Sequence, residues 1–249
     1  MTVPPPFAGW TRTDALPILM YHRVASTGYP ARDRWRMRPD CFEAQLKLLR
    51  DGGFESATFE EWRQASVARR SLPGRRVSLT FDDGFADFGT VAWPLLKAYG
   101  FKATVFLVTG SVGRWNTWDV DGEAEPLMGW DTILRLRDEG VEFGGHSVTH
   151  PHLTVLSQER IFAEAFESRV AIEERLQTPV SAFAYPYGEH DGGVRHVVGA
   201  AGFTYGVTCD VGRATGADSL LALPRIEVYG DAVPAELLRM LETEAPLTP

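Results

Sequence analysis

The stretch VSLTFDDG at residues 77–84 joins an apolar run, typical of a buried strand, to two adjacent carboxylates and a glycine. Comparable runs recur on both sides of it, separated by segments whose apolar residues have helical spacing. These runs lie at residues 16–21, 103–108, 141–145, 181–184, 203–207 and 223–228. The alternation predicts parallel βα units, and at 249 residues it favours one closed (β/α) barrel over an open sheet.

The predicted helices have typical ends. Residues 40–43 (DCFE) and 58–61 (TFEE) have the pattern of capping boxes, and the glycines at 52–53 indicate a helix end. The longest predicted helix covers residues 158–176, and Pro234 is typical of the first residue of a closing helix.

The charge balance limits the classes of partner. The chain has 25 Lys and Arg against 33 Asp and Glu, which gives a formal net charge of −8, and 44% of its residues are hydrophobic. This is the composition of a folded globular protein. Its acidity argues against a nucleic-acid-binding protein, which needs a basic surface. We expect a short lead over residues 1–15 and a single domain over residues 16–249, and the oligomeric state stays open.

No stretch has the pattern of a secretory leader or a membrane span. The N-terminal residues MTVPPP include neither a basic nor an apolar region, and no apolar run approaches the roughly 18 residues that cross a bilayer. Cys41 and Cys209 are too few for a disulfide framework. We therefore expect a cytoplasmic protein, or a secreted or periplasmic one if a leader has been removed.

Polar side chains follow five of the predicted strands. In a βα barrel the carboxyl ends of the strands form one mouth, where catalytic residues collect. One such residue would mean little, but five strand ends together predict a site. The residues at these ends are His22, Asp82, Asp83, His146, His150, Tyr187 and Arg225.

The acidic pair and the histidine pair together indicate a metal site. Asp82 and Asp83 repel each other, so a nearby cation would allow both to stay ionised; the alternative is a simple Asp-Gly turn. His146 and His150 would share one face of a helical turn and could bind one metal; the alternative is two unrelated histidines. Two nitrogen ligands and one oxygen ligand match a catalytic zinc-type site with an open position, which leaves one carboxylate as a general base.

Three motifs, in this order, resemble those of the polysaccharide deacetylases (carbohydrate esterase family 4, the NodB-homology domain). They are TFDDG at 80–84, HSVTH at 146–150 and YPYG at 185–188, and the similarity extends over about residues 16–228. The resemblance implies a distorted (β/α)7-type barrel, a polysaccharide deacetylase-like catalytic domain and metal-dependent N-deacetylation of an acetamido sugar.

The resemblance also implies roles for individual residues. Asp82 would be the general base, and Asp83, His146 and His150 would bind a divalent metal. Zinc is the first choice, with cobalt, nickel or iron as alternatives. The backbone N–H of Tyr187 would donate to the oxyanion of the tetrahedral intermediate, and Pro186 and Tyr187 would contact the substrate.

The sequence departs from the family pattern in two places. Ala184 stands where the third motif commonly has an Arg that orients the base, and we take Arg225 as its replacement. The late Leu-x-His motif that supplies the general acid is missing, whereas LMYH ends at His22 near the start of the chain. This arrangement resembles the branch with the poly-N-acetylglucosamine deacetylases, so we assign His22 as the general acid.

The expected substrate is an N-acetylated sugar or oligosaccharide. Trp115, Trp118 and Trp130 lie in one aromatic segment, and sugars commonly stack on such rings; Trp130 is our candidate for substrate contact, although packing is an equal alternative. Two other functions stay open. One is a related amidohydrolase or deformylase acting on a non-polymeric substrate, and the other is an inactive carbohydrate-binding homologue.

Overall fold

The computed structural model describes residues 16–26, 34–68, 72–118, 124–230 and 232–242, so the predicted lead over residues 1–15 lies outside the described part. Seven strands form the closed barrel: β1 (Ile18–Tyr21), β5 (Arg75–Phe81), β6 (Thr104–Leu107), β7 (Glu142–Gly145), β8 (Ala182–Ala184), β9 (Tyr205–Val211) and β10 (Leu223–Glu227). They pair in parallel in the order β1-β10-β9-β8-β7-β6-β5, and β1 also pairs with β5. This closes the sheet and confirms the predicted barrel of the (β/α)7 type.

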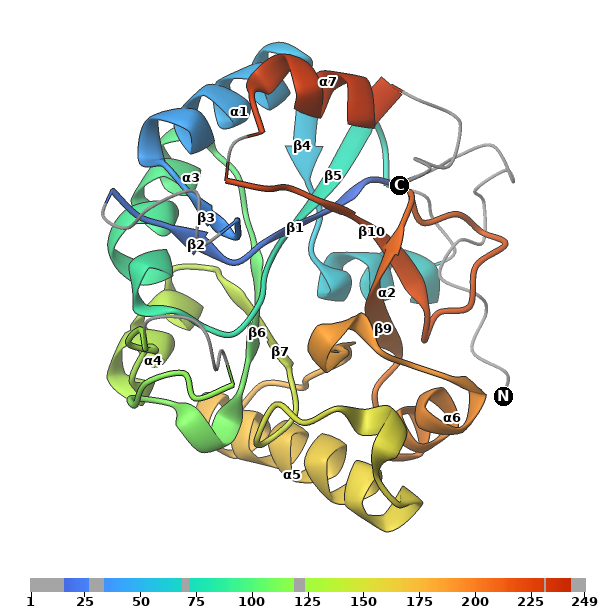
Figure 1. Ribbon diagram of the computed structural model, residues 1–249. Helices are drawn as coiled ribbons and strands as arrows, with labels where there is room; N and C mark the ends of the chain where they lie inside the picture. Colours follow the sequence, from blue (N-terminus) through green and yellow to red (C-terminus); the bar gives the residue numbers. More distant parts are fainter. Residues whose placement is uncertain (1–15, 27–33, 69–71, 119–123, 231, 243–249) are drawn as a thin grey trace.

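Helices surround the strands (Figure 1). The surrounding helices are α1 (Pro39–Asp51), α3 (Trp93–Tyr99), α4 (Trp130–Asp138), α5 (Gln158–Leu176), α6 (Gly192–Ala200) and α7 (Pro234–Glu242). The shorter elements are β2 (Arg23–Val24), β3 (Arg36–Met37), β4 (Phe54–Ser56), a π-helical turn (Phe88–Ala92) and 3-10 turns at Thr109–Ser111, Leu153–Val155 and Pro186–Gly188. No helix among the described residues is long and apolar enough to cross a membrane.

The buried residues form two hydrophobic clusters, because successive strand residues face opposite sides of the barrel wall. Along β6, Val105 and Leu107 belong to the outer cluster with the surrounding helices, whereas Phe106 belongs to the inner cluster. Helix α2 (Phe59–Val67) contributes Phe59 and Trp62 to that inner cluster, and the rings of Phe59 and Phe106 lie 6.0 Å apart. Helix α2 therefore fills the end of the barrel opposite the carboxyl ends of the strands.

The two predicted capping boxes have different outcomes. The backbone N–H of Glu61 donates to Thr58 Oγ1, and the backbone N–H of Thr58 donates to Glu61 Oε2 at 3.0 Å, so the box at 58–61 is confirmed. The box at 40–43 was wrong: helix α1 begins at Pro39, with Arg38 as its N-cap and no side-chain cap. Proline suits the first helical position, and the Asp40 carboxylate pairs with Arg38 instead.

The first strand closes the barrel between two strands that are distant in sequence. Leu19 of β1 lies opposite Ile226 of β10 on one side and opposite Leu79 of β5 on the other. Because all three strands are parallel, the residues that follow β1, β5 and β10 meet at the same mouth. The ring closure thus brings His22, near the start of the chain, beside Asp82.

Candidate active site

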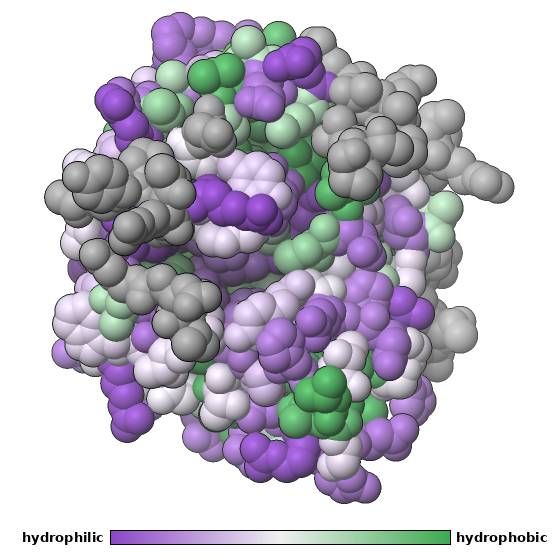
Figure 2. Space-filling view, viewed as in Figure 1, coloured by the Kyte–Doolittle hydropathy of each residue, from purple (hydrophilic) through white to green (hydrophobic). Residues whose placement is uncertain are grey.

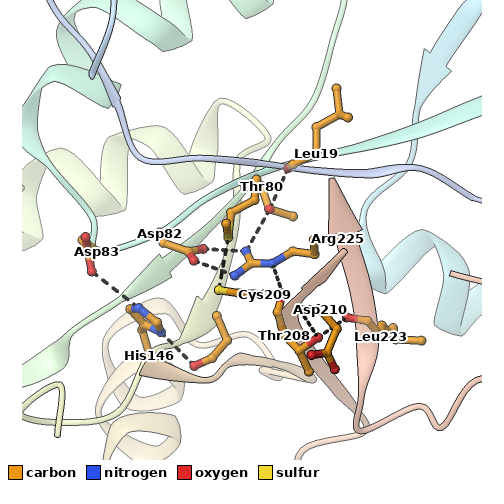
Figure 3. Close-up of polar contacts among 12 residues, drawn as sticks. Leu19, Thr80, Asp82, Asp83, His146, Thr208, Cys209, Asp210, Leu223 and Arg225 are labelled. Atoms are coloured by element: carbon orange, nitrogen blue, oxygen red, sulfur yellow. Dashed lines mark hydrogen bonds and ion pairs between the residues drawn. The ribbon is translucent and has the colours of Figure 1, made fainter. Parts of the chain in front are cut away.

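A buried ion pair lies at the centre of the mouth. Arg225 projects from β10 and donates from Nη1 to Asp82 Oδ1 at 2.8 Å and from Nη2 to Asp82 Oδ2 at 2.7 Å (Figure 3). Arg225 Nε donates to the Thr208 carbonyl at 2.8 Å, and Nη1 also reaches Thr80 Oγ1 at 3.2 Å. Both ends of the guanidinium are fixed, so the Asp82 carboxylate is held in one orientation.

Asp82 is ionised in this setting. Burial opposes its ionisation, but the charge of Arg225 and its two hydrogen bonds outweigh burial and hold the pKa of Asp82 well below its ordinary value. A carboxylate that is already charged and fixed in orientation can accept a proton from a water molecule in front of it.

Next to this pair, three buried side chains form a group with the composition of a metal site. Asp83, His146 and His150 each offer one ligand atom, and these atoms lie within 4.8 Å of one another. The Nε2 atoms of the two histidines lie 3.4 and 3.5 Å from Asp83 Oδ1, which has no hydrogen-bond partner among the described residues. A buried carboxylate oxygen without a donor, facing two imidazole nitrogens, fits a divalent cation.

The two histidines have opposite protonation tendencies. Burial lowers the pKa of His150 to about 3, with the nearby His146 lowering it further, so His150 is neutral and able to bind a metal. Burial opposes protonation of His146, but the Asp83 carboxylate beside its Nε2 and the charge of Asp82 raise its pKa. His146 Nδ1 lies 2.8 Å from the Ala184 carbonyl; donation to that acceptor leaves Nε2 to face Asp83.

The histidine motif does not form the helical turn expected from its spacing. Ser147 and His150 have φ angles of 64° and 58°, and the His150 backbone N–H donates to Ser147 Oγ at 2.9 Å. Glu164 of α5, 3% exposed, accepts the backbone N–H groups of Val148 and Thr149 at 2.9 Å each. The prediction of a helical turn was therefore wrong, because an irregular turn tied to α5 places the two imidazoles.

Backbone conformations that L-residues rarely adopt are concentrated at the mouth. Five described residues other than glycine have positive φ. Asp83, Ser147, His150 and Tyr187 are four of them, and only Gln177, at the end of α5, lies elsewhere. Such conformations cost about 1–3 kcal/mol each and persist where the surroundings enforce them, commonly at functional sites.

Aromatic rings line the side of the mouth near His150. Trp118 stacks on His150 with ring centroids 4.7 Å apart, and Tyr187 meets His150 edge-on at 4.6 Å. Tyr187 is 42% exposed and stacks on His152 at 4.0 Å, whereas Pro186 is buried beside it. The space-filling view shows a recess near the middle of the face that is drawn, surrounded mainly by hydrophilic side chains (Figure 2).

Two further predicted residues are Trp130, which packs away from the mouth, and His22, which lies at a strand end as predicted. Trp130 packs against the outer hydrophobic cluster at the start of α4, with the Arg175 guanidinium 5.6 Å from its ring centre, so no contact supports its predicted role in substrate binding. His22 follows β1 directly, and its ring lies 4.6 Å from that of Trp35.

Sequence reasoning missed Glu164 and Trp35. Glu164 could have been found, because it lies on the same helical face as Ile161, Ala165 and Ser168, all of which are buried. A carboxylate within the buried face of an amphipathic helix needs partners. Trp35 had no such signal, because the pairing of β2 with β3 brings it beside His22.

Comparisons with known proteins agree with this geometry. Residues 69–206 match the family model of polysaccharide deacetylase. The deacetylase PplD of Streptococcus pyogenes, solved in complex with acetate, is 30% identical and superposes with a TM-score of 0.82 over 93% of this chain and 100% of its own.

Two further proteins show the same likeness. IcaB from Ammonifex degensii is 25% identical with a TM-score of 0.77, over 92% of this chain and 98% of its own. The poly-β-1,6-N-acetyl-D-glucosamine N-deacetylase of Staphylococcus aureus is 26% identical over 202 residues, which cover 77% of this chain and 67% of that protein.

Proposed function

The chain belongs to the polysaccharide deacetylase family, and on that premise we propose that it is a metal-dependent hydrolase that removes N-acetyl groups from an amino sugar of a glycan and releases acetate. The observation that carries the proposal is the ionised Asp82, clamped by Arg225, beside the buried group of Asp83, His146 and His150. The named activity of the Staphylococcus aureus relative supports a poly-N-acetylglucosamine type of substrate.

Asp83, His146 and His150 would hold the cation, and we propose zinc because two imidazoles and one carboxylate suit it. A divalent cation held there supplies Lewis-acid chemistry, which lowers the pKa of water and polarises the acetyl carbonyl. The Ala184 carbonyl and Glu164 keep the histidine ligands in place.

Asp82 acts as the general base in this proposal. It accepts a proton from water while the water oxygen bonds to the acetyl carbon, and Arg225 keeps the carboxylate aimed and charged. Arg225 thereby performs the orienting task that an Arg at position 184 performs in the family pattern.

His22 and Tyr187 complete the reaction. The backbone N–H of Tyr187 donates to the oxyanion that forms when water adds to the carbonyl. As the carbon–nitrogen bond breaks, His22 gives a proton to the leaving amine, and acetate and the free amino sugar are the products.

Acetate release from defined N-acetylated sugars tests the proposal. Oligomers of N-acetylglucosamine with β-1,6 and β-1,4 links, the monosaccharide and an N-formyl analogue would be compared, each with and without chelator. We expect acetate from at least one oligomer and no release after chelation. Turnover of the N-formyl analogue alone would favour a deformylase, and binding of oligomers without any turnover would favour an inactive carbohydrate-binding protein.

A further inference from the structure

His22 lacks the orienting partner that catalytic histidines usually have. A general acid or base histidine is normally aimed by an acceptor on its second ring nitrogen. His22 Nδ1 is buried and has no hydrogen-bond partner among the residues that the structure describes. Among the described residues, therefore, no hydrogen bond to Nδ1 sets the direction of this ring.

Trp35 instead contacts the ring of His22. The ring centroids of His22 and Trp35 lie 4.6 Å apart with planes inclined by 39°. Trp35 in turn lies 5.3 Å from the ring of Tyr229, which follows β10. The Arg34 guanidinium carbon lies 4.5 Å from the Trp35 ring centre and 4.6 Å from that of Tyr229, and Arg34 Nη2 donates to Tyr229 Oη at 3.1 Å. The indole is thus held between His22, which follows β1, and Tyr229, which follows β10.

The backbone fixes the same segment. The Gly230 N–H donates to the Arg34 carbonyl at 2.7 Å, and the Arg23 N–H donates to the Trp35 carbonyl at 3.3 Å. A Cβ at Gly230 would lie 2.0 Å from the Arg36 carbonyl oxygen, so only glycine allows this approach. The chain around Trp35 is therefore attached both to the residue after His22 and to the end of β10.

We propose that Trp35 is a positioning residue for His22. The face of its indole sets the ring direction that an acceptor on Nδ1 would otherwise set, and Arg34 and Tyr229 hold the indole in place. This inference rests on the proposed function, in which His22 protonates the leaving amine. It gives a task to Arg34 and Trp35, directly before β3, which the family motifs do not cover.

Four variants separate positioning from other effects: Trp35→Leu, Trp35→Phe, His22→Ala and the double variant Trp35→Leu/His22→Ala. We expect Trp35→Leu to lower kcat about 10-fold to 100-fold at unchanged KM, and Trp35→Phe, which keeps a flat ring, to recover most of the loss. His22→Ala should lower kcat by about 10²–10⁴. The double variant should match His22→Ala, because a residue that acts through another adds nothing once that other is gone.

A control and a spectroscopic measurement exclude a general loss of structure. Trp62→Leu removes a buried tryptophan from the opposite end of the barrel, so it should lower the melting temperature and leave kcat unchanged. In the metal-free protein, the carbon-bound ring protons of His22 should show an NMR ring-current shift that Trp35→Leu removes and Trp35→Phe partly keeps.

Each contrary result has its own meaning. Unchanged kcat in Trp35→Leu would overturn the positioning role, and so would a raised KM at unchanged kcat, which would make Trp35 a substrate-binding residue. A further loss of kcat on adding Trp35→Leu to His22→Ala would overturn it as well. Unchanged activity in His22→Ala would instead remove His22 as the general acid, which is a failure of the proposed function.

Discussion

At the scale of single residues, the Asp82–Arg225 pair joins a proposed catalytic role to a contribution to stability. Both groups are almost fully buried, and each neutralises the charge of the other. Removing one partner of a buried pair leaves an uncompensated charge and costs about 3–5 kcal/mol, whereas removing both is often neutral. Effects on folding and on turnover can therefore be separated at this pair.

The variant Asp82→Asn should lose turnover by at least about 10²-fold, because the amide cannot accept the proton. It should also melt earlier, since Arg225 stays buried without a counter-charge, while bound metal measured by elemental analysis stays near one equivalent. The double variant Asp82→Asn/Arg225→Met should recover the melting temperature and stay inactive. Full activity in either variant would contradict the role of Asp82 as the base.

Glu164→Gln should weaken metal binding without unfolding the protein. A neutral amide oxygen accepts the backbone N–H groups of Val148 and Thr149 less strongly than a carboxylate oxygen, and the amide NH2 cannot accept the Thr149 hydroxyl proton as Glu164 Oε1 does. Loss of such supporting contacts typically costs 10–100-fold in metal affinity. Competition titration with a chromophoric chelator measures the affinity. The matched control is Glu167→Gln, an exposed position on the same helix, and equal affinities in the two variants would exclude the supporting role of Glu164.

At the scale of helices and strands, local signals predicted what local interactions decide. The helix over residues 158–176 was predicted with its observed bounds, and the capping box at 58–61 is present. The strand ends placed Asp82 and Arg225 at one mouth, because parallel strands share their direction. These elements depend on neighbours within about four residues and on apolar periodicity, so the sequence reveals them.

Interactions between segments distant in sequence could not be predicted from the sequence. The turn carrying His146 and His150 depends on Glu164, and its positive φ angles cannot be inferred from the spacing of two histidines. In the same way, Glu142 of β7 accepts the backbone N–H groups of Phe59 at 3.0 Å and Glu60 at 2.7 Å, and so caps α2 from a distant strand. Such contacts become visible only when the barrel is assembled.

Glu142 should make stability depend on pH. Burial raises its pKa from 4.5 to about 7, and its hydrogen bonds only partly offset this effect. Between these values the folded state binds more protons than the unfolded state, so stability falls as pH rises from about 4.5 to about 7. The decrease amounts to about 3 kcal/mol at most, since one pKa unit corresponds to about 1.4 kcal/mol.

Melting temperatures of the wild type and of Glu142→Gln, measured from pH 5 to pH 8, test this expectation. The difference between the two proteins isolates Glu142 from other titrating groups, and the wild type should lose stability relative to the variant as pH rises. Parallel curves over the whole range would show that Glu142 does not titrate there.

At the scale of the whole molecule, the fold should not depend on bound metal. The barrel is closed by backbone pairing around hydrophobic clusters, so we expect the chelated protein to stay folded and become inactive. Added zinc should raise the melting temperature, because a ligand at a hundredfold excess over its Kd stabilises by about 2.7 kcal/mol. In His146→Ala this rise should be absent, and a wild-type rise there would contradict the assignment of His146 as a ligand.

The position of β1 has a consequence for how the protein is made. Of the seven barrel strands it leaves the ribosome first, yet one of its two neighbours, β10, is the last of the seven to be synthesised. Until then one edge of its apolar run ILMY stays unpaired, and such edges promote aggregation. The barrel closes around β1 only when β10 has emerged. Hydrolytic activity therefore requires that translation has passed β10.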